Sequence, residues 1–265
     1  MTEKEAEELC KMIRIGVDLS KPKYNYHPKT LEELKDLIEE LIEERGNRAN
    51  LNDVDVSQIT DMSWLFDNSQ FNGDISSWDV SEVRSMFRMF CNSRFNGDIS
   101  KWNVSKVENM RQMFQSSQFN GDISKWDVSG VKSMSYMFGY SNNFNGDISN
   151  WNVSGVEEMR GMFISSQFNG DISNWNVSKV EDMWGMFCGS QFNSDISNWN
   201  VGKVKNMGHL FAESQFNGDI SKWDVSNVKE MKYIFANSRF NGNISKWAKK
   251  PKGYIKKIRI KKKLV

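Results

Sequence analysis

Seven aspartates recur at one fixed place in a repeated motif of this chain, and carboxylates in such a column could bind cations. If they stack about 4.8 Å apart, as neighbouring strands do, adjacent carboxylates repel by about 0.9 kcal/mol even in water. A hard cation such as calcium could offset that repulsion. Alternatively each carboxylate accepts backbone N–H bonds at its own turn, which is the simpler interpretation. The column consists of Asp74, Asp98, Asp122, Asp147, Asp171, Asp195 and Asp219.

The sequence contains no cluster of residues of the kinds that catalysis needs. The two histidines, His27 and His209, stand in unrelated contexts, and no Ser-His-Asp grouping, phosphate loop or Cys/His metal spacing is present. His209 occupies a position that other copies fill with Trp64, Arg88 or Gln112, which is typical of a variable exposed site. We therefore expect no enzyme activity, no catalytic residue, no cofactor and no small-molecule substrate.

The cysteines and the first residues indicate a compartment. Cys91 and Cys188 stand four repeats apart, roughly 20 Å at strand spacing, which is too far for a disulfide. With Cys10 they are expected to be free thiols, which suits a reducing environment. The stretch from Met1 to Ile15 has no apolar run long enough for a signal peptide. These features predict a cytoplasmic location.

Aromatic residues keep the same period as the aspartates and point to a repeat architecture. A spacing of 24 residues, once 25, is the signature of stacked coils that pack only on their neighbours. Because the rings keep step with Ile and Val, we expect a buried ladder and not a surface for stacking sugars or bases. The ladder comprises Phe71, Phe95, Phe119, Phe144, Phe168, Phe192, Phe216 and Phe240, with Trp78, Trp102, Trp126, Trp151, Trp175, Trp199, Trp223 and Trp247.

One copy predicts the local structure of all of them. Apolar residues over Val83–Phe90 follow helical spacing, so a short helix is expected there. Asn96-Gly97 predicts a tight corner that needs positive φ, and Ile99–Val104 then predicts a short parallel strand. The fold class is therefore an α/β repeat solenoid. The recurring Asn beside each glycine is expected to bond the backbone of the next coil.

Both ends of the array carry distinct segments. Residues 1–50 form an expected helical cap, in which Thr30 and Glu33 make a capping box and Gly46 ends the helix. Residues 51–247 hold the eight-copy array. Residues 248–265 form a basic end in which Ile258 and Ile260 alternate as in an edge strand. The overall charge of +1 therefore conceals an acidic array with a basic tail.

The repeat resembles that of the BspA-type leucine-rich-repeat surface proteins of bacteria, whose copies read much like MFxxSxxFNGDISxWDVSxVxxM. The likeness runs from about Leu51 to Trp247. It implies leucine-rich-repeat-like coils, absence of catalysis, and a role in adhesion or protein binding at the cell surface, after removal of an export signal.

Positions that change from copy to copy are the candidate binding surface. A protein is the expected partner, because repeat rods mostly present extended binding surfaces. The alternative is that the basic tail binds nucleic acid or an anionic membrane. One variable column contains Lys101, Lys125, Asn150, Asn174, Asn198 and Lys222, and a second contains Arg111, Ser135, Arg160, Trp184, Gly208 and Lys232.

Overall fold

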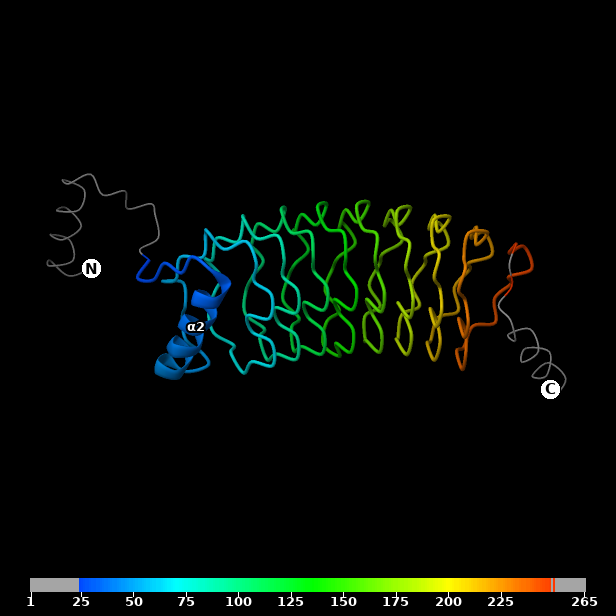
Figure 1. Ribbon diagram of the computed structural model, residues 1–265. Helices are drawn as coiled ribbons and strands as arrows, with labels where there is room; N and C mark the ends of the chain where they lie inside the picture. Colours follow the sequence, from blue (N-terminus) through cyan, green and yellow to red (C-terminus); the bar gives the residue numbers. More distant parts are fainter. Residues whose placement is uncertain (1–23, 249, 251–265) are drawn as a thin grey trace, which may run out of the picture.

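In the computed structural model, which describes residues 24–248 and 250, the chain winds into an elongated stack of coils (Figure 1). The helix α2, Leu31–Arg45, lies at the N-terminal end of the stack. Over the described residues α2 is the one helix, and pairing between coils takes the form of isolated β-bridges without extended strands. No helix in this part of the chain is long and apolar enough to cross a membrane.

The boundaries of α2 follow from its caps. Thr30 Oγ1 accepts a hydrogen bond from the Glu33 amide at 3.1 Å, and the Glu33 carboxylate accepts one from the Lys29 amide at 2.7 Å. The helix ends at Gly46, whose φ of 84° suits glycine and whose amide donates to the Ile42 carbonyl. This is the helix that the capping box predicted. Its buried side, Leu34, Ile38 and Leu41, joins the core of the coils.

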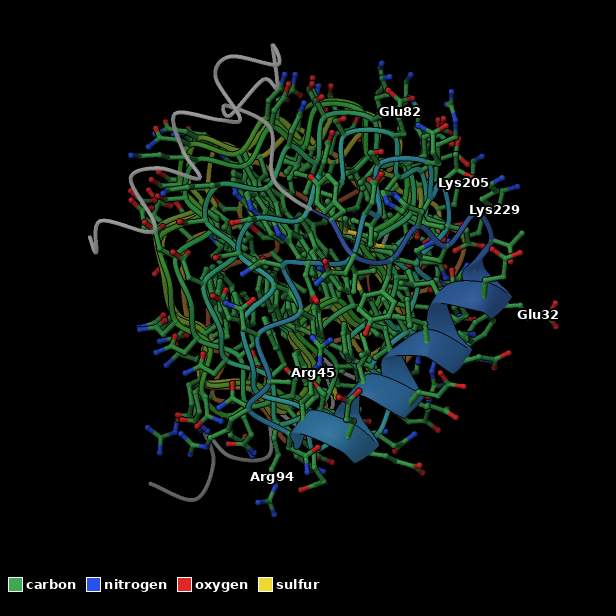
Figure 2. The ribbon with its side chains drawn as sticks, turned by 90° about the vertical axis from the view of Figure 1, so that its left-hand side faces the viewer. Glu32, Arg45, Glu82, Arg94, Lys205 and Lys229 are labelled. Atoms are coloured by element: carbon green, nitrogen blue, oxygen red, sulfur yellow. The ribbon has the colours of Figure 1, made fainter. Side chains whose placement is uncertain are left out.

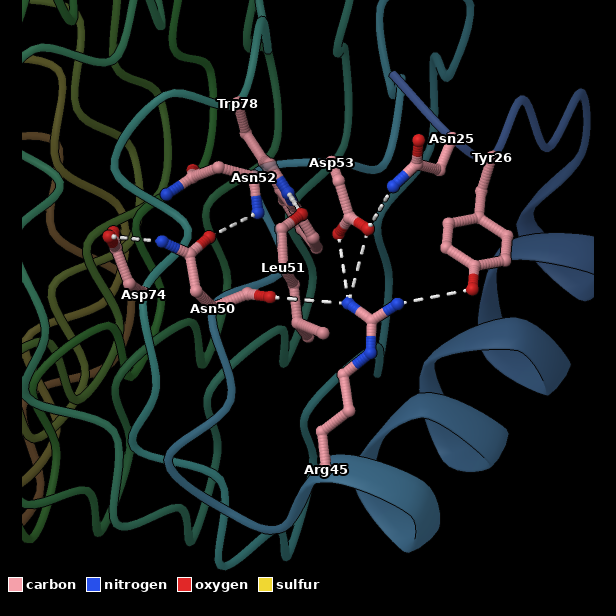
Figure 3. Close-up of polar contacts among 9 residues, drawn as sticks. All are labelled: Asn25, Tyr26, Arg45, Asn50, Leu51, Asn52, Asp53, Asp74 and Trp78. Atoms are coloured by element: carbon pink, nitrogen blue, oxygen red, sulfur yellow. Dashed lines mark hydrogen bonds and ion pairs between the residues drawn. The ribbon is translucent and has the colours of Figure 1, made fainter. Parts of the chain in front are cut away.

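Arg45, the last residue of α2, fastens the helix to the first coil (Figure 3). Its Nη1 atom donates to both carboxylate oxygens of Asp53, at 3.1 and 3.2 Å, and its Nη2 atom donates to the Tyr26 hydroxyl at 3.1 Å. Asn25 Nδ2 also donates to Asp53, at 2.9 Å. The Arg45–Asp53 pair is half-buried, so its geometry is held better than that of an exposed ion pair.

One column of parallel bridges joins all the coils along the stack. Around each bridge the backbone bonds run in both directions. The Met62 amide donates to the Ser85 carbonyl at 2.9 Å, and the Arg84 amide donates back to the Thr60 carbonyl at 2.7 Å. The column comprises Asp61, Ser85, Asn109, Ser133, Glu158, Asp182, Asn206 and Glu230.

The predicted short helix in each copy, Val83–Phe90 in the second, is wrong, because Ser85 forms a parallel bridge and turns follow it over residues 87–90. Arg88 has left-handed backbone, with φ of 56°. Its amide donates to the Arg111 carbonyl of the next coil at 3.0 Å, whereas the Met89 amide donates back to Met86 within its own coil at 3.2 Å. An α-helix would use every such amide internally. The alternation instead leaves every second amide for the neighbouring coil.

The predicted strand Ile99–Val104 is also wrong. Within it the Trp102 amide donates to the Ile99 carbonyl at 3.2 Å, which closes a turn. The parallel pairing of this coil occurs instead at Asn109. Ile99, Trp102 and Val104 can be buried by a turn as well as by a strand, so the apolar pattern could not distinguish the two.

The Asn-Gly corners need glycine for space and not for positive φ, which corrects the expected reason. The glycines with positive φ are Gly46, Gly161, Gly185 and Gly189, none of which follows Asn in this motif. At Gly73 a Cβ atom would lie 2.0 Å from the Ala49 carbonyl oxygen. The close approach of two coils therefore excludes a side chain at Gly73, whereas at Gly121 the crowding comes from the Phe119 ring of the same turn, 2.9 Å from a Cβ atom.

The repeated asparagines bond one coil to the next, as the sequence suggested. Asn72 Oδ1 accepts a hydrogen bond from the Asn96 amide at 2.9 Å, and Asn96 Oδ1 accepts one from the Asn120 amide at 2.7 Å. The same bond recurs down to Asn241. Each corner is thereby held in register with its neighbours.

Stacked rings fill the interior. Every Phe and Trp of the predicted ladder is at most 4 % exposed. In the second coil Phe90 and Phe95 have centroids 4.4 Å apart, and Phe90 lies 5.7 Å from Phe114 of the next coil. Offset stacking of this kind adds to the free energy gained by burying the rings.

The ladder tryptophans also donate a hydrogen bond across coils. Trp151 Nε1 donates to the Ile123 carbonyl of the preceding coil at 3.0 Å, and its ring stacks on that of Trp175 at 6.5 Å. All eight ladder tryptophans make the equivalent bond, at 2.9 to 3.2 Å. The same carbonyl also accepts a backbone amide within its own coil, as Ile123 does from Trp126 at 3.2 Å, so the indole adds a second hydrogen bond that connects the coils.

We predict that Trp151→Ala lowers the free energy of unfolding by about 3–5 kcal/mol, because it leaves a cavity in the stacked core. Trp151→Phe keeps most of the volume but removes one of the two hydrogen bonds that the Ile123 carbonyl accepts, the other coming from the Trp126 amide, so a loss of about 0.5–1.5 kcal/mol is expected. The exposed control Lys101→Ala should change it by less than about 0.5 kcal/mol. Urea titration followed by circular dichroism measures all three. Equal effects at Trp151 and Lys101 would contradict burial of the tryptophan column.

Candidate binding face

The segment that carries the bridges and the left-handed turns presents a continuous face, which we call the ladder face. It consists of residues 61–69 and their equivalents in every coil. Large side chains on it are held at positive φ, which is uncommon for bulky residues. They include Trp64 at 61°, Tyr136 at 59°, His209 at 57° and Tyr233 at 57°. The inter-coil bonds fix these conformations, so the backbone beneath the face is rigid and preorganised.

A row of aromatic and cationic side chains crosses the ladder face. Arg160 Nε donates to the Tyr136 hydroxyl at 3.2 Å, and the Arg160 guanidinium lies over the Trp184 ring, 4.4 Å from its centroid. Trp184 contacts His209 with centroids 5.5 Å apart, and His209 contacts Tyr233 at 5.1 Å. We call these five residues the aromatic row. Tyr233 is 62 % exposed, so the row reaches the solvent.

A hollow of about 240 Å³ opens beside the aromatic row at Gly208. Trp184 lies against it, since a Cβ atom at Gly208 would be 3.0 Å from Trp184 Cδ1. Glycine therefore provides the open space between coils at this point. The hollow is lined by Trp184, Gly208, His209, Glu230, Lys232 and Tyr233.

The two predicted binding columns lie in different surroundings. Arg160, Trp184 and Lys232 of the second column belong to the ladder face. Arg111 of the same column approaches Glu158 at 3.5 Å on an adjoining part of that face. The first column follows the aspartate corners instead. Its members Lys101, Lys125, Asn150, Asn174, Asn198 and Lys222 are all exposed.

Each aspartate of the column accepts a hydrogen bond from a backbone amide of its own turn. Asp98 Oδ1 accepts a hydrogen bond from the Ser100 amide at 2.9 Å, and the same bond recurs at the other six. That bond lowers the pKa of Asp98, and the nearby charge of Lys101 lowers it further, while Asp122 opposes the shift. This is the turn geometry that the simpler interpretation expected. Over the described residues, no group of three or more His, Cys, Asp or Glu is arranged to hold a metal ion.

Charged side chains form pairs around the rest of the stack. Viewed along its length, Glu82, Lys205 and Lys229 point outward at one edge of the outline (Figure 2). Lys205 pairs with Glu181 at 2.6 Å, and Glu82 pairs with Lys106. These exposed pairs contribute little to stability. They connect neighbouring coils, and their charges are balanced locally.

The two described cysteines are free and poorly reactive. Burial raises the pKa of Cys91 to about 11, with an opposing contribution from Arg88. Burial also raises the pKa of Cys188. Both therefore remain thiols at neutral pH. Cys10 and the predicted basic tail, apart from Ala248 and Lys250, lie outside the described residues.

Sequence reasoning found part of the aromatic row and missed the rest. Arg160 and Trp184 belong to a column predicted as a binding surface, and His209 was predicted only as a variable exposed position. Tyr136, Tyr233 and the contacts that join these five side chains were not predicted. A usable signal was present, because Tyr136, His209 and Tyr233 occupy the same variable position of their copies.

The repeats and the contacts between them define a repeat protein. Three overlapping stretches, residues 33–138, 95–191 and 164–258, match the family described as Mycoplasma protein of unknown function, DUF285. Together these stretches cover most of the chain, which therefore belongs to that family. No curated protein and no solved structure matches the chain.

We predict that the aspartate turns make stability sensitive to acid. The pKa of each carboxyl is lowered from 3.8 in the folded state. Each carboxylate therefore contributes to the free energy of unfolding above pH 3.8, and this contribution is lost as the pH falls through the lowered pKa. The triple change Asp122→Asn, Asp147→Asn, Asp171→Asn should flatten the decline in urea midpoint below about pH 4. Asp36→Asn, on the exposed side of α2, is the charge control. An unchanged decline in the triple variant would contradict the hydrogen-bond origin.

A ligand that binds the folded state raises the melting temperature. We expect the aspartates not to bind calcium, so millimolar calcium should leave the melting temperature unchanged to within about 1 °C. The reason is that one oxygen of each aspartate already accepts a serine amide, as at Asp147 with Ser149. Differential scanning fluorimetry with and without chelator measures this. A rise that chelator reverses would instead support a cation-binding edge.

Proposed function

We propose that the chain is a non-catalytic, leucine-rich-repeat-like solenoid that binds another protein through its ladder face. The observation that carries this proposal is the aromatic row, in which Tyr136, Arg160, Trp184, His209 and Tyr233 contact one another at the surface. Tyr, Trp and Arg are the residue types enriched where proteins bind each other most tightly.

The rigidity of the face supports the same function. Ordering loops and side chains on binding costs free energy, and a preorganised surface avoids much of that cost. The backbone beneath the aromatic row is fixed by bonds between coils, such as Gly185 to Gly208 at 2.8 Å and His209 to Lys232 at 3.0 Å. A partner would meet side chains already placed for contact.

The non-catalytic part of the proposal rests on how the chemical groups are distributed. Carboxylates and hydroxyls recur evenly from coil to coil, whereas catalysis needs a unique cluster. His209 lies between Trp184 and Tyr233, where its ring takes part in aromatic contacts. Adhesion and cell-surface display, which the BspA-type resemblance implies, are a narrower form of the same proposal.

Site-directed photo-crosslinking tests the binding face. A photoreactive phenylalanine derivative replaces Arg111, Arg160 or Lys232 on the ladder face, and Lys101 or Asn150 beside the aspartate corners as matched controls. After irradiation in lysate of the producing organism, the ladder-face positions should give one common adduct that protease removes and nuclease does not. Equal adducts from the control positions, or a nuclease-sensitive adduct, would contradict the proposal.

A further inference from the structure

The hollow at Gly208 is the part of the ladder face best suited to receive a single group from a partner. Trp184 forms one side, Tyr233 lies two coils further along than Trp184, and His209 connects the two rings. Its volume of about 240 Å³ has room for roughly eight waters at about 30 Å³ each. A ring-sized apolar group therefore fits in the hollow, against the aromatic side chains that line it.

The backbone around the hollow is already engaged, which limits how a ligand can bind. The Gly185 amide donates to the Gly208 carbonyl at 2.8 Å, and the His209 amide donates to the Lys232 carbonyl at 3.0 Å. The Gly208 amide donates to Asn206 Oδ1 at 3.1 Å. A peptide cannot add here as an extra strand, because strand addition needs unpaired backbone groups at an edge. Side chains must provide the recognition.

The indole N–H of Trp184 is a hydrogen-bond donor available beside the hollow. Trp184 Nε1 donates to no described residue, unlike the indole nitrogens of the eight ladder tryptophans. Two acceptors nearby already take backbone amides, since Glu230 Oε1 accepts from the Lys232 amide at 2.7 Å and Asn206 Oδ1 accepts from the Gly208 amide at 3.1 Å. The second Glu230 oxygen lies 3.9 Å from the Lys232 ammonium. A ligand that complements Trp184 presents a carbonyl acceptor to its indole N–H and an apolar ring to the aromatic side chains.

Proline in the polyproline II conformation has those properties, since it lacks an N–H group and keeps its carbonyls solvated. The spacing also agrees. Tyr136, Trp184 and Tyr233 occur on every second coil, which is roughly 9.6 Å at about 4.8 Å per coil. A polyproline II helix repeats about every 9.3 Å, three residues at about 3.1 Å each. Gly161 and Gly208 lie against the Tyr136 and Trp184 rings on the intervening coils.

We propose that the ladder face binds a proline-rich, polyproline II segment of its protein partner, with one proline ring in the hollow beside Trp184 and the rest of the segment running along the aromatic row. Aromatic-lined grooves bind such segments elsewhere because the ligand is already ordered before it binds. This inference rests on the proposed protein-binding function and specifies the chemistry of the partner.

The test uses the full chain and a fluorescein-labelled proline peptide of roughly ten residues, long enough to form several polyproline II turns. A peptide of the same length with alanine at every third position keeps one proline face, and a peptide without proline is the negative control. Fluorescence anisotropy should show saturable binding to the first two. The peptide without proline should bind at least about tenfold more weakly, since one hot-spot contact is worth about that much or more.

Variants then locate the bound peptide. Trp184→Ala removes the indole, and Gly208→Val fills the hollow while keeping Trp184. Each should weaken binding at least about tenfold, as loss of a buried anchor contact does. Tyr140→Ala, an exposed aromatic outside the row, should change it by less than about twofold because isolated surface contacts contribute little. Urea midpoints show whether each variant is folded. If Trp184→Ala does not fold, the result for Gly208→Val decides the outcome.

Absence of saturable binding by the proline peptides, or binding that neither variant weakens, would overturn the inference. Binding of an oligosaccharide that Trp184→Ala abolishes would assign the hollow to a sugar instead. The proline peptide should also compete with the photo-crosslinks at Arg111 and Arg160. Crosslinks that persist in its presence would leave protein binding intact and reject only the polyproline II partner, whereas absence of position-specific crosslinks when no peptide is added would reject both.

Discussion

The structure depends on register between coils. Each coil donates backbone N–H groups to residues one repeat away, and a single residue per coil forms the parallel bridge that positions them. The indole N–H of each ladder tryptophan and the Oδ1 atom of each corner asparagine add two further bonds in the same register. A shift by one residue would leave all of these groups unpaired at once, and would turn buried side chains outward. Stability, shape and the placement of surface side chains therefore depend on one repeat length.

One copy is a residue longer than the usual repeat, and it shows where the coils tolerate an insertion. The fourth copy has one extra residue between Ser141 and Phe144, at a corner outside the bridge segment. There Asn143 Nδ2 donates to Gln118 Oε1 at 2.7 Å, and the rings on both sides keep their stacking, with Phe119 and Phe144 at 6.4 Å. Surface corners absorb insertions because few inter-coil bonds pass through them. The ladder face contains most of those bonds, which is why it can hold strained, bulky residues in fixed positions for a partner.

The sequence predicted the stacking of copies, the buried ring columns, the asparagine bonds and the capped helix, because each depends on residue type at a fixed spacing. It failed for the conformation within a copy. Met86, Met89 and Phe90 have helical spacing, yet a run of turns with left-handed residues buries the same three side chains and leaves amides for the next coil. Apolar periodicity reports which residues face inward and cannot report where the amides point. For the same reason the candidate columns were found, whereas the contact of His209 with Tyr233 was not.

The most direct test of this account is a pair of single-residue insertions in the fifth coil. An asparagine inserted after Gln167 imitates the natural insertion of the fourth copy, and an asparagine inserted after Met162 interrupts the ladder face. Urea unfolding should show a loss of less than about 1 kcal/mol for the corner insertion, as for one lost hydrogen bond. The insertion after Met162 in the ladder face should lower the free energy of unfolding by at least about 3 kcal/mol, because several backbone groups lose their partners together. Equal losses at the two sites would contradict the claim that inter-coil register on the ladder face holds the structure together.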